Sequence, residues 1–535
     1  MSYAIDFGTS NTVVARWNAA TREPETLKLP GLSVTQANNP PLIPSLVYVE
    51  DAANECILTG QLVRDRGLDL SMDARFFRSF KRGIGSSIQG FLPELDGRTV
   101  SFEQVGAWFL RQVLEQVQKT GPTDSIVFTV PVDSFEPYRH WLGQVVSAQG
   151  PAALPVEQVR LLDEPTAAAL GYGLQAGEQL LVIDFGGGTL DLAWVQLNLE
   201  ANGSKPLGFV LKWGEKLFAE KSGQRPKVAR VMAKAGMNLG GTDLDNWLVD
   251  YFAQTQELPR NSLITRLAER LKIQLSARPK ASEVYFNDET LESYDLSLER
   301  SQFEQILEER GFFAGLEETV TQVLQQAQRQ GLTANDLDHV LLVGGTAQIP
   351  AVQNWVRERF GSDKVRGEKP FEAIAHGALQ ISQGVELKDF LYHSYGVRYW
   401  DRRNNCHSWH PLIPAGQAYP MSQPVELVLG ASLESQPSIE LVIGELGSES
   451  KAAEVFFDGD RLITRTSSQA QTQVQPLNDR DGARSIAQLN PPGYPGSDRI
   501  RVLFQVDVRR TLRITVEDIL TGDTLLEDRE VVELS

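Results

Sequence analysis

The stretch Leu180–Leu192 reads LLVIDFGGGTLDL, and its pattern decides the fold. An apolar run enters three glycines and an alternating segment leaves them. This predicts a buried strand, a tight turn and a second strand, because the run is too short for a helix and glycine tolerates positive φ. The glycine N–H groups carry no side chains, so phosphate oxygens could approach them closely. Asp184 and Asp191 flank the turn, where they could hold Mg²⁺ directly or through its waters. A hairpin with a flexible tip is the alternative for this stretch taken alone.

A second copy of the pattern lies at the start of the chain, where Tyr3–Asn11 reads YAIDFGTSN. The Asp-Phe-Gly triplet at residues 6–8 follows a short apolar strand and precedes a hydroxyl residue, Thr9. The triplet at residues 184–186 likewise precedes Thr189. Two such copies, each embedded in strands, predict two halves of one domain that face a single nucleotide.

The composition describes a large acidic chain. Its 535 residues, 41% of them hydrophobic, predict more than one domain with sizeable cores. Asp and Glu number 69 against 51 Lys and Arg, which argues against a nucleic acid or an anionic membrane as the main partner. Cys56 and Cys406 make no disulfide framework, and no run approaches the roughly 18 apolar residues of a spanning helix. With no targeting segment recognised, we expect a soluble, cytoplasmic protein.

The sequence pattern changes near residue 384. Before it, strand and helix patterns alternate, and helices are expected at 102–119, 136–148, 301–330 and 350–360. From Tyr395 onward, glycine, proline and serine separate short alternating segments. These predict an all-β region with strands at 425–429, 439–443, 500–508 and 511–517. The joining segment 385–394 mixes apolar and charged residues, so it could dock on a neighbour in one state and come free in another.

Residues 198–238 hold a basic island within the acidic chain. A solvated insertion is one interpretation, and a docking patch for an acidic partner is the other. The basic residues are Lys212, Lys216, Lys221, Arg225, Lys227, Arg230 and Lys234.

Six motifs, taken in order along the chain, resemble those of the DnaK-type 70-kDa heat-shock chaperone family, which is part of the actin-like, ribonuclease-H-like ATPases. The ordered agreement covers about the first 384 residues and is highly specific. The motifs are IDFGTSNT (5–12), VRLLDEPTAAALGYG (159–173), VIDFGGGTLDL (182–192), LGGTDLD (239–245), LLVGG (341–345) and KPFEAIAHGAL (369–379).

This resemblance implies an α/β fold followed by an all-β domain. Residues 1–384 would form a two-lobed, actin-like nucleotide-binding domain with a basic insertion near 200–238. Residues 385–394 would be the interdomain linker, and 395–535 a substrate-binding-like β-sandwich. The β-rich part resembles the family more faintly, through PLIPAGQAYP (411–420) and QLNPPGYPG (488–496).

The resemblance also implies a site for ATP or ADP with Mg²⁺ in the cleft between the lobes. Asp6 and Asp184 would hold the metal through its waters. The expected catalytic residues are Lys81, Glu164, Asp191, Thr189 and Thr9. The expected nucleotide contacts are Asp6, Gly8, Thr9, Ser10, Asp184, Gly186, Gly187, Gly188, Thr189, Gly240, Gly241, Glu269, Lys272, Ser276, Gly344 and Gly345. A lysine near the γ-phosphate suits phosphoryl transfer, which depends on positioning and on charge stabilisation.

The chain departs from the family pattern on the adenine side. Gln348 and Ile273 stand where basic residues are usual, and Phe371 stands where an aspartate is usual. We therefore expect hydrolysis to persist with weaker nucleotide affinity. The apolar linker is only loosely preserved at residues 389–391. After the strand expected at 529–534 nothing remains to form a helical lid, so we expect a short, lidless member that exchanges its clients faster.

The expected function is that of an ATP-dependent, chaperone-like protein in protein folding and stress response. ATP turnover would control the binding of unfolded or extended polypeptide clients by the β domain. A J-domain co-chaperone and a nucleotide exchange factor are further expected partners, with neither nucleic acid nor membrane, and the chain is expected to be monomeric. Arg160 matches a position used with J-domain partners but could equally be an ordinary surface residue. A small-molecule kinase of the same superfold and a non-hydrolysing scaffold stay open as alternatives.

Overall fold

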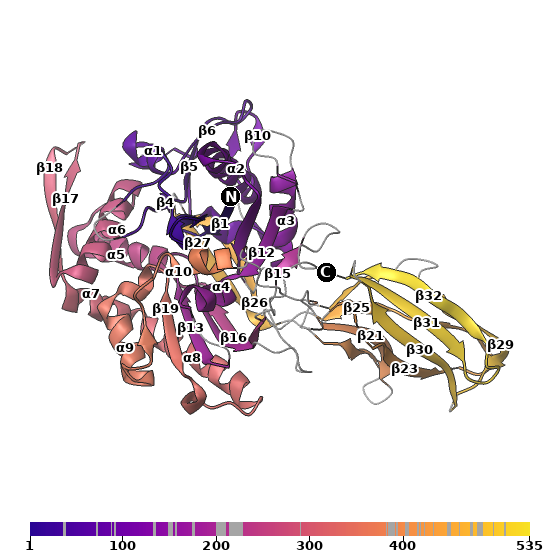
Figure 1. Ribbon diagram of the computed structural model, residues 1–535. Coiled ribbons are helices and arrows are strands. Elements are labelled where there is room, and N and C mark those ends of the chain that lie inside the picture. Colours follow the sequence, from indigo (N-terminus) through magenta and orange to yellow (C-terminus); the bar gives the residue numbers. More distant parts are fainter. Residues whose placement is uncertain are drawn as a thin grey trace. The chain divides into compact units, whose positions relative to one another are not determined.

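The structure is a computed structural model in which the chain forms two compact units (Figure 1). The first unit draws on Met1–Ala201, Val210–Leu387 and Ala453–Thr466, and the second on Lys388–Ala452 and Ser467–Ser535. The residues described are 1–35, 39–70, 73–86, 88–89, 92–131, 135–147, 154–155, 158–173, 177–198, 210–212, 228–288, 290–380, 382, 391, 394–401, 406–414, 417, 419–421, 423–431, 433–446, 451–458, 461–470, 474–478, 485–495, 497–507 and 510–534.

Seven of the described strands form the first sheet of the first unit, in the order β15–β12–β11–β1–β2–β3 with β4 paired to β2. β1 and β2 form an antiparallel hairpin around the first Asp-Phe-Gly triplet. β11 runs parallel to β1, and β12 runs parallel to β11. The strands are β1 (Ser2–Phe7), β2 (Asn11–Asn18), β3 (Glu23–Thr26), β4 (Ile43–Pro44), β11 (Ser125–Val130), β12 (Val159–Asp163) and β15 (Val210–Lys212).

Five described strands form the second sheet, in the order β16–β14–β13–β19–β20. Each of them runs parallel or antiparallel to its neighbours as the strand at the matching place in the first sheet does. β13 and β14 are an antiparallel hairpin in which Asp184 lies opposite Asp191, and β19 runs parallel to β13. The strands are β13 (Gln179–Phe185), β14 (Leu190–Asn198), β16 (Val228–Met237), β19 (His339–Val343) and β20 (Val365–Arg366). The predicted strand–turn–strand structure is confirmed for both copies, and the two halves repeat one topology.

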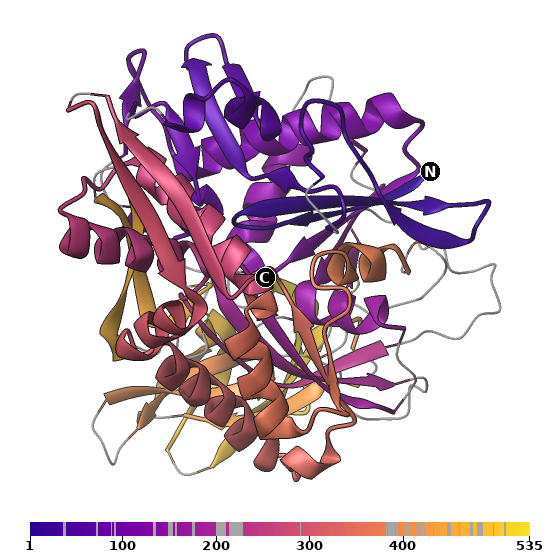
Figure 2. The same ribbon diagram turned by 90° about the vertical axis from the view of Figure 1, so that its left-hand side faces the viewer.

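Helices surround these sheets, and many follow local sequence signals. Ser101 and Gln104 form a capping box at the start of α2, and Asp163 caps α4 with Pro165 in its first turn. Figure 2 shows the indigo and violet elements in the upper part of the first unit and the rose-to-orange helices in the lower part. The helices are α1 (Gln61–Asp65), α2 (Phe102–Thr120), α3 (Phe135–Ser147), α4 (Glu164–Gly171), α5 (Gly241–Gln256), α6 (Ser262–Ala277), α7 (Arg300–Glu309), α8 (Phe312–Gln328), α9 (Pro350–Phe360) and α10 (Ala373–Gln380).

Two short helices interlock the halves. α4 follows the first sheet but packs against β13 and β14 of the second, whereas α10 follows the second sheet and packs against β1 and β2 of the first. The helices touch each other at glycines. A Cβ atom added to Gly377 would lie 1.8 Å from the carbonyl oxygen of Ala167, and one added to Gly171 would lie 1.9 Å from that of Ala373. The relation between the two sheets therefore depends on the absence of two side chains.

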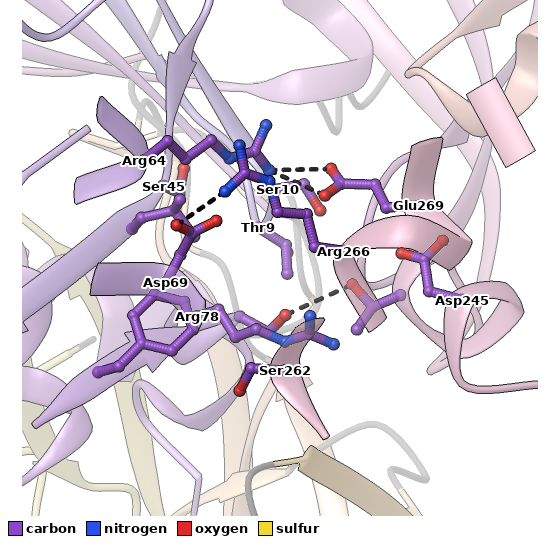
Figure 3. Close-up of a pocket in the computed structure, with 14 residues that line it drawn as sticks. Thr9, Ser10, Ser45, Arg64, Asp69, Arg78, Asp245, Ser262, Arg266 and Glu269 are labelled. Atoms are coloured by element: carbon purple, nitrogen blue, oxygen red, sulfur yellow. Dashed lines mark hydrogen bonds and ion pairs between the residues drawn. The ribbon is translucent and has the colours of Figure 1, made fainter. Parts of the chain in front are cut away.

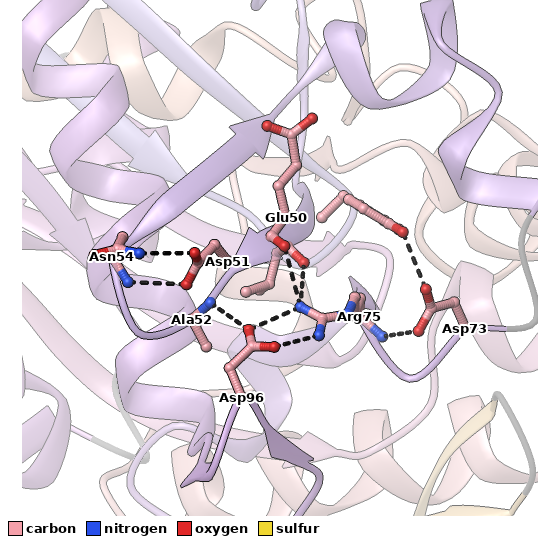
Figure 4. A network of polar contacts seen from close by, with 9 residues as sticks. Glu50, Asp51, Ala52, Asn54, Asp73, Arg75 and Asp96 are labelled. Atoms are coloured by element: carbon pink, nitrogen blue, oxygen red, sulfur yellow. Dashed lines mark hydrogen bonds and ion pairs between the residues drawn. The ribbon is translucent and has the colours of Figure 1, made fainter.

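A small sheet and a polar network hold the segment that leads to Lys81. β5 (Leu46–Asp51) pairs with β6 (Cys56–Thr59) and with β7 (Phe76–Arg78). Asp96 and Gly97 both have positive φ and form the tight turn between β9 (Glu94–Leu95) and β10 (Arg98–Thr99). The Arg75 guanidinium donates to both oxygens of Asp96, at 2.5 and 2.9 Å, and to two carbonyl oxygens of β5 (Figure 4). These hydrogen bonds lower the pKa of Asp96 to about 2, so it stays ionised near neutral pH.

Two further strand pairs belong to the first unit. β17 (Lys280–Asn287) and β18 (Glu292–Glu299) form a hairpin that stands out in Figure 1. β26 (Lys451–Asp458) pairs with β27 (Arg461–Ala470) and runs parallel to β8 (Ile88–Gln89), with Glu454 opposite Ile88.

The second unit is built from strands. Two four-stranded sheets, β22–β21–β25–β28 and β23–β30–β31–β32, share one hydrophobic core with buried Val397 and Ile443 from one sheet and Phe504 and Ile514 from the other. β24 pairs with β29. The strands are β21 (Ser394–Asp401), β22 (Cys406–Ile413), β23 (Val425–Gly430), β24 (Gln436–Glu440), β25 (Ile443–Leu446), β28 (Val474–Pro476), β29 (Ser485–Gly493), β30 (Asp498–Val506), β31 (Thr511–Asp518) and β32 (Thr524–Glu533).

The helical prediction for residues 301–330 is confirmed as two helices, because Gly311 adopts a left-handed conformation (φ 73°) and separates α7 from α8. One predicted strand is wrong in detail. Residues 439–443 are not one strand. β24 ends at Glu440 and β25 begins at Ile443, since the buried Asn478 amide accepts from the N–H of Ile443 and donates to the carbonyl oxygen of Leu441.

Parts of two sequence predictions lie outside the described residues. In the joining segment 385–394, the residues that are not described are 385–390, 392 and 393. In the basic island, the structure does not describe Lys216, Lys221, Arg225 and Lys227, nor the side chains of Lys212 and Arg230.

The contact between α4 and α10 gives a stability prediction. Gly377→Ala places a methyl group against the backbone of α4, so the helices must separate and the first unit should lose roughly 3 kcal/mol of stability. Gly367→Ala is the matched control, since its added Cβ would lie 3.4 Å from Leu342, an ordinary contact. Thermal unfolding of both variants measures the difference, and equal midpoints would contradict the interlock.

Candidate functional site

The two Asp-Phe-Gly bends meet each other. A Cβ atom added to Gly187 would lie 2.0 Å from Ser10 Oγ, and one added to Gly188 would lie 2.7 Å from Thr9 Oγ1. Any larger residue at these positions would displace the opposite hairpin. The predicted convergence of the two bends is therefore present in the structure.

Two further glycine pairs close around the second bend. At the start of α5, the N–H of Gly241 donates to the carbonyl oxygen of Gly186 (3.1 Å), and a Cβ added to Gly240 would lie 2.5 Å from the backbone of Gly187. After β19, Gly344 adopts φ 83°, a left-handed conformation that favours glycine.

The second of these pairs abuts Asp184. A Cβ added to Gly344 would lie 2.8 Å from Asp184 Oδ1, and Thr346, just after Gly345, donates its hydroxyl to the carbonyl oxygen of Gly186 (2.8 Å). In the first bend, Ser45 donates to the carbonyl oxygen of Gly8 (2.7 Å). All the glycine segments singled out from the sequence thus surround one region.

A cluster of carboxylates and one lysine lies beside the bends. Lys81 Nζ is 3.1 Å from Glu164 Oε1, and the two side chains are only 13% and 10% exposed. Thr129 donates its hydroxyl to Asp6 Oδ1 at 2.8 Å. Glu164, Asp184 and Asp191 together line a cavity of about 330 Å³. The structure therefore brings the five predicted metal and catalytic groups of this set into one neighbourhood.

Burial perturbs the protonation of this cluster. It raises the pKa of Asp6 to about 6, with a further contribution from the negative charge of Glu164, and raises the pKa of Asp184 well above its usual range. Burial alone would lower the pKa of Lys81, but Glu164, Asp6 and Asp184 outweigh it and the pKa is raised. Several buried carboxylates thus interact with a single lysine, and a divalent cation would compensate the excess negative charge.

Aromatic rings also support Lys81. Its ammonium lies 5.7 Å from the centre of the Phe7 ring and 5.8 Å from that of Tyr138, within range of a cation–π attraction. Phe7 is the central residue of the first Asp-Phe-Gly triplet. The triplet therefore supplies a carboxylate, a ring and a bare backbone turn to the same region.

A pocket with a volume of about 490 Å³ opens beside the bends (Figure 3). Hydroxyl groups and charged side chains line most of it. Glu269 of α6 faces Arg64 across it, and the guanidinium donates to both carboxylate oxygens, at 2.8 and 3.2 Å. The polar and charged lining residues are Thr9, Ser10, Ser45, Arg64, Asp69, Arg78, Ser79, Thr242, Asp245, Ser262, Arg266 and Glu269.

Two more of the predicted nucleotide contacts, Lys272 and Ser276, lie on the same helix. Lys272 Nζ donates to the carbonyl oxygen of Gly241 (2.7 Å) and pairs with Asp245 (2.7 Å), whereas the Ser276 hydroxyl donates to the backbone of Lys272. Burial raises the pKa of Asp245 to about 6 although Lys272 opposes the shift. Burial also raises the pKa of Glu269, but Arg64 and Lys272 outweigh it, so this pKa is lowered.

The residues that depart from the family pattern differ in exposure. Ile273 is 49% exposed, and Gln348 is half-buried at the end of a short 3₁₀ turn after β19. Phe371 lies against Gly345, where an added Cβ would be 3.2 Å from the ring.

Several residues of the site carry no signal in the sequence. Thr129, Tyr138, Ser45 and Arg64 reach the site from segments far along the chain, and nothing in their local patterns marks them. Asp245 could have been singled out, because it lies within the motif LGGTDLD and on the helix that begins at the glycine pair.

Comparison with known proteins follows this geometry. A family model described as Hsp70 protein matches residues 90–203 and 227–403, which is more than half of the chain. The chain belongs to the Hsp70 family. The residues skipped between the two matched segments, 204–226, fall within the basic island, and Asp6, Thr9 and Lys81 precede the first segment.

Curated Hsp70 relatives align over most of the chain at low identity. The chain is similar to "Chaperone protein DnaK" of Thermosipho africanus, with 25% identity over 97% of this chain and 78% of the relative. It is similar to the protein of the same name from Thermus thermophilus, with 26% identity over the same shares. For that of Deinococcus proteolyticus, identity is 28% over 83% of this chain and 63% of the relative.

Two findings concern the remaining sequence predictions. Among the described residues, no helix combines the length and apolar character needed to cross a bilayer. Arg160 lies on β12, is half-buried, and has a pKa lowered by burial.

The perturbed carboxylate Asp245 predicts a pH dependence. Its pKa is higher in the folded chain than in the unfolded chain, so the folded chain binds the proton more tightly between about pH 4 and pH 6. The free energy of unfolding should therefore fall by up to about 3 kcal/mol as pH rises through this window. Asp245→Asn should remove this loss, so its stability relative to wild type should improve from pH 4 to pH 8 in thermal unfolding. A difference that is the same at both pH values would contradict the assignment.

Proposed function

We propose that the chain is an ATP-dependent molecular chaperone, in which ATP bound and hydrolysed in the first unit controls polypeptide binding by the second. The observation that carries this proposal is the convergence of the two Asp-Phe-Gly bends beside the buried Lys81–Glu164 pair. Membership of the Hsp70 family and similarity to proteins named as chaperones support it.

The phosphates would lie between the two bends. Gly187 and Gly188 carry no side chain and lie against Ser10 and Thr9, so phosphate oxygens would be bound by the backbone N–H groups of the glycines and the hydroxyls of Thr9 and Ser10. Asp6 and Asp184 would hold Mg²⁺, and the excess of buried carboxylates suits a divalent cation. When bound, the metal would neutralise charge on the phosphate oxygens.

Lys81, Glu164 and Asp191 would act at the reacting phosphate. The pairing of Lys81 with Glu164 and its contact with two rings fix the ammonium, so it can stabilise transferred charge without reorganisation. Glu164 and Asp191 would order the metal and the attacking water. Thr189 would contact the phosphates from the turn between β13 and β14.

Adenosine would bind along α6. Glu269 lines the large pocket, and Lys272 and Ser276 follow it on the helix at helical spacing. Gly344 and Gly345 would approach the nucleoside from the end of β19. The missing basic residues at Ile273 and Gln348 support the expectation of weaker nucleotide affinity.

We also propose the finer architecture, with an actin-like two-lobed ATPase domain over residues 1–384, a linker at 385–394 and a β-sandwich over 395–535. The repeated sheet topology and the interlocking helices support the two lobes. Two sheets that share one core support the sandwich. Clients would be unfolded or extended polypeptides, with a J-domain co-chaperone and a nucleotide exchange factor as further partners.

A measurement of ATP turnover with and without a chemically unfolded polypeptide tests the function. We expect turnover that needs Mg²⁺ and rises to saturation with polypeptide concentration, because client binding and ATP state are coupled. Stimulation by sugars or other small acceptors instead would favour the kinase alternative. No turnover at all would favour a non-hydrolysing scaffold.

The role of Lys81 gives a separate prediction. Lys81→Ala should lower single-turnover hydrolysis by about 100- to 1,000-fold, since one preorganised charge at the transferred phosphate is removed. Lys119→Ala, at an exposed position near the end of α2, is the matched control and should hydrolyse ATP like wild type. Near-ultraviolet circular dichroism checks that the variant stays folded without the buried partner of Glu164. Turnover within twofold of wild type would exclude Lys81 from the reaction.

A further inference from the structure

The charges around the large pocket pair almost completely. Each of three carboxylates is matched by one cation across or beside the pocket, and two of these pairs join elements that are distant in sequence. The pairs are Arg64–Glu269 (2.8 Å), Arg266–Asp69 (3.2 Å) and Lys272–Asp245 (2.7 Å).

Among the described lining residues, Arg78 is the cation that belongs to none of these pairs. Its guanidinium makes no hydrogen bond and no ion pair with the described part of the chain, and its side chain is half-buried. Asp245 and Glu269 feel its charge but are already matched. The described wall of the pocket, with Lys272 included, therefore carries one net positive charge, and that charge lies on Arg78.

The backbone holds Arg78 in a fixed place. It is the last residue of β7, opposite Leu46 of β5, and the hydrogen bonds of Arg75 to Asp96 and to β5 anchor the start of this segment (Figure 4). The next residue, Ser79, is buried with φ 56°, a left-handed conformation that is costly for a residue other than glycine. This bend turns the chain, so that Lys81 reaches the carboxylate cluster while Arg78 lines the pocket (Figure 3).

The neighbours of Arg78 are suited to an anion. Thr9, Ser10, Thr242 and Ser262 line the same pocket and offer hydroxyl donors. A guanidinium that has no carboxylate partner presents a planar fork of donors, which matches a phosphate group.

We infer that Arg78 binds a phosphate group of the bound nucleotide, as a second protein cation besides Lys81. This inference rests on the proposed function, because it takes the occupant of the pocket to be an adenine nucleotide. Arg78 then adds affinity for the phosphate chain and none for the nucleoside. A role confined to attraction toward Asp245 and Glu269 is the competing explanation.

Calorimetric titration of the full-length chain with ADP, ATP and adenosine, each in Mg²⁺, tests the inference. Arg78→Gln removes the charge and leaves a shorter, polar side chain. It should weaken ADP and ATP by about 10- to 100-fold, the effect of one charge-assisted hydrogen-bonded contact, and leave adenosine within about twofold. Arg78→Lys should restore part of the loss, which a packing defect would not allow. Arg66→Gln, an exposed arginine paired with Glu50 outside the pocket, is the matched control.

The outcomes separate the inference from the function on which it rests. If Arg78→Gln lost the same affinity for adenosine as for ADP, or lost none for either, the role of Arg78 would be overturned. Binding of ADP by wild type would still support a nucleotide site. If wild type bound neither ADP nor ATP, both the proposed function and the inference would fall. A smaller salt dependence of ADP affinity in Arg78→Gln than in wild type is also expected, because one exposed charge contact is lost.

Discussion

In the first unit, two glycine positions of one hairpin turn lie directly against the hydroxyl residues of the other turn, and the other features of the site depend on this close approach. Gly187 and Gly188 face Ser10 and Thr9 at distances that no Cβ atom could occupy, and Gly240 closes on the same turn. A hairpin turn without side chains has its N–H groups free to bind other groups, but it gains nothing from packing. A turn of glycines that faces a turn with two hydroxyl residues packs poorly as a core, but it is suited to bind an anion.

Charge divides this cradle into two regions of opposite sign. On one side Asp6, Glu164 and Asp184 share Lys81, and burial together with the negative charge of Glu164 raises the pKa of both aspartates. On the other side the pairs around the large pocket leave Arg78 as an excess cation. A metal-bound phosphate chain has the complementary arrangement, since its cation suits the carboxylates and its oxygens suit the arginine. Neither region alone identifies a nucleotide, whereas their contact at the glycine bends favours one.

Sequence reasoning reached the parts of this site that are written in local patterns. The two hairpins, α2 and α9 follow from alternation and from the helical spacing of apolar residues, and the structure confirms them. It failed where a distant residue decides. Asn478 ends one strand and begins another, and the pairs that involve Thr129 or Arg64 join positions more than 100 residues apart. Long-range pairs leave no trace in a single sequence, because either partner alone is an ordinary polar residue.

The departures from the family pattern on the adenine side can be interpreted together with the proposed role of Arg78. Where basic residues are usual, this chain has an exposed isoleucine and a glutamine, and Phe371 covers Gly345. Loss of cations near the base weakens contacts that every adenine compound shares, whereas a cation near the phosphates strengthens only contacts that depend on charge. On our proposals the chain has therefore moved its binding free energy from the nucleoside toward the phosphates. Such a site would distinguish nucleotides by their phosphate chain more than by their base, and the anchored strand β7 is what makes that shift possible.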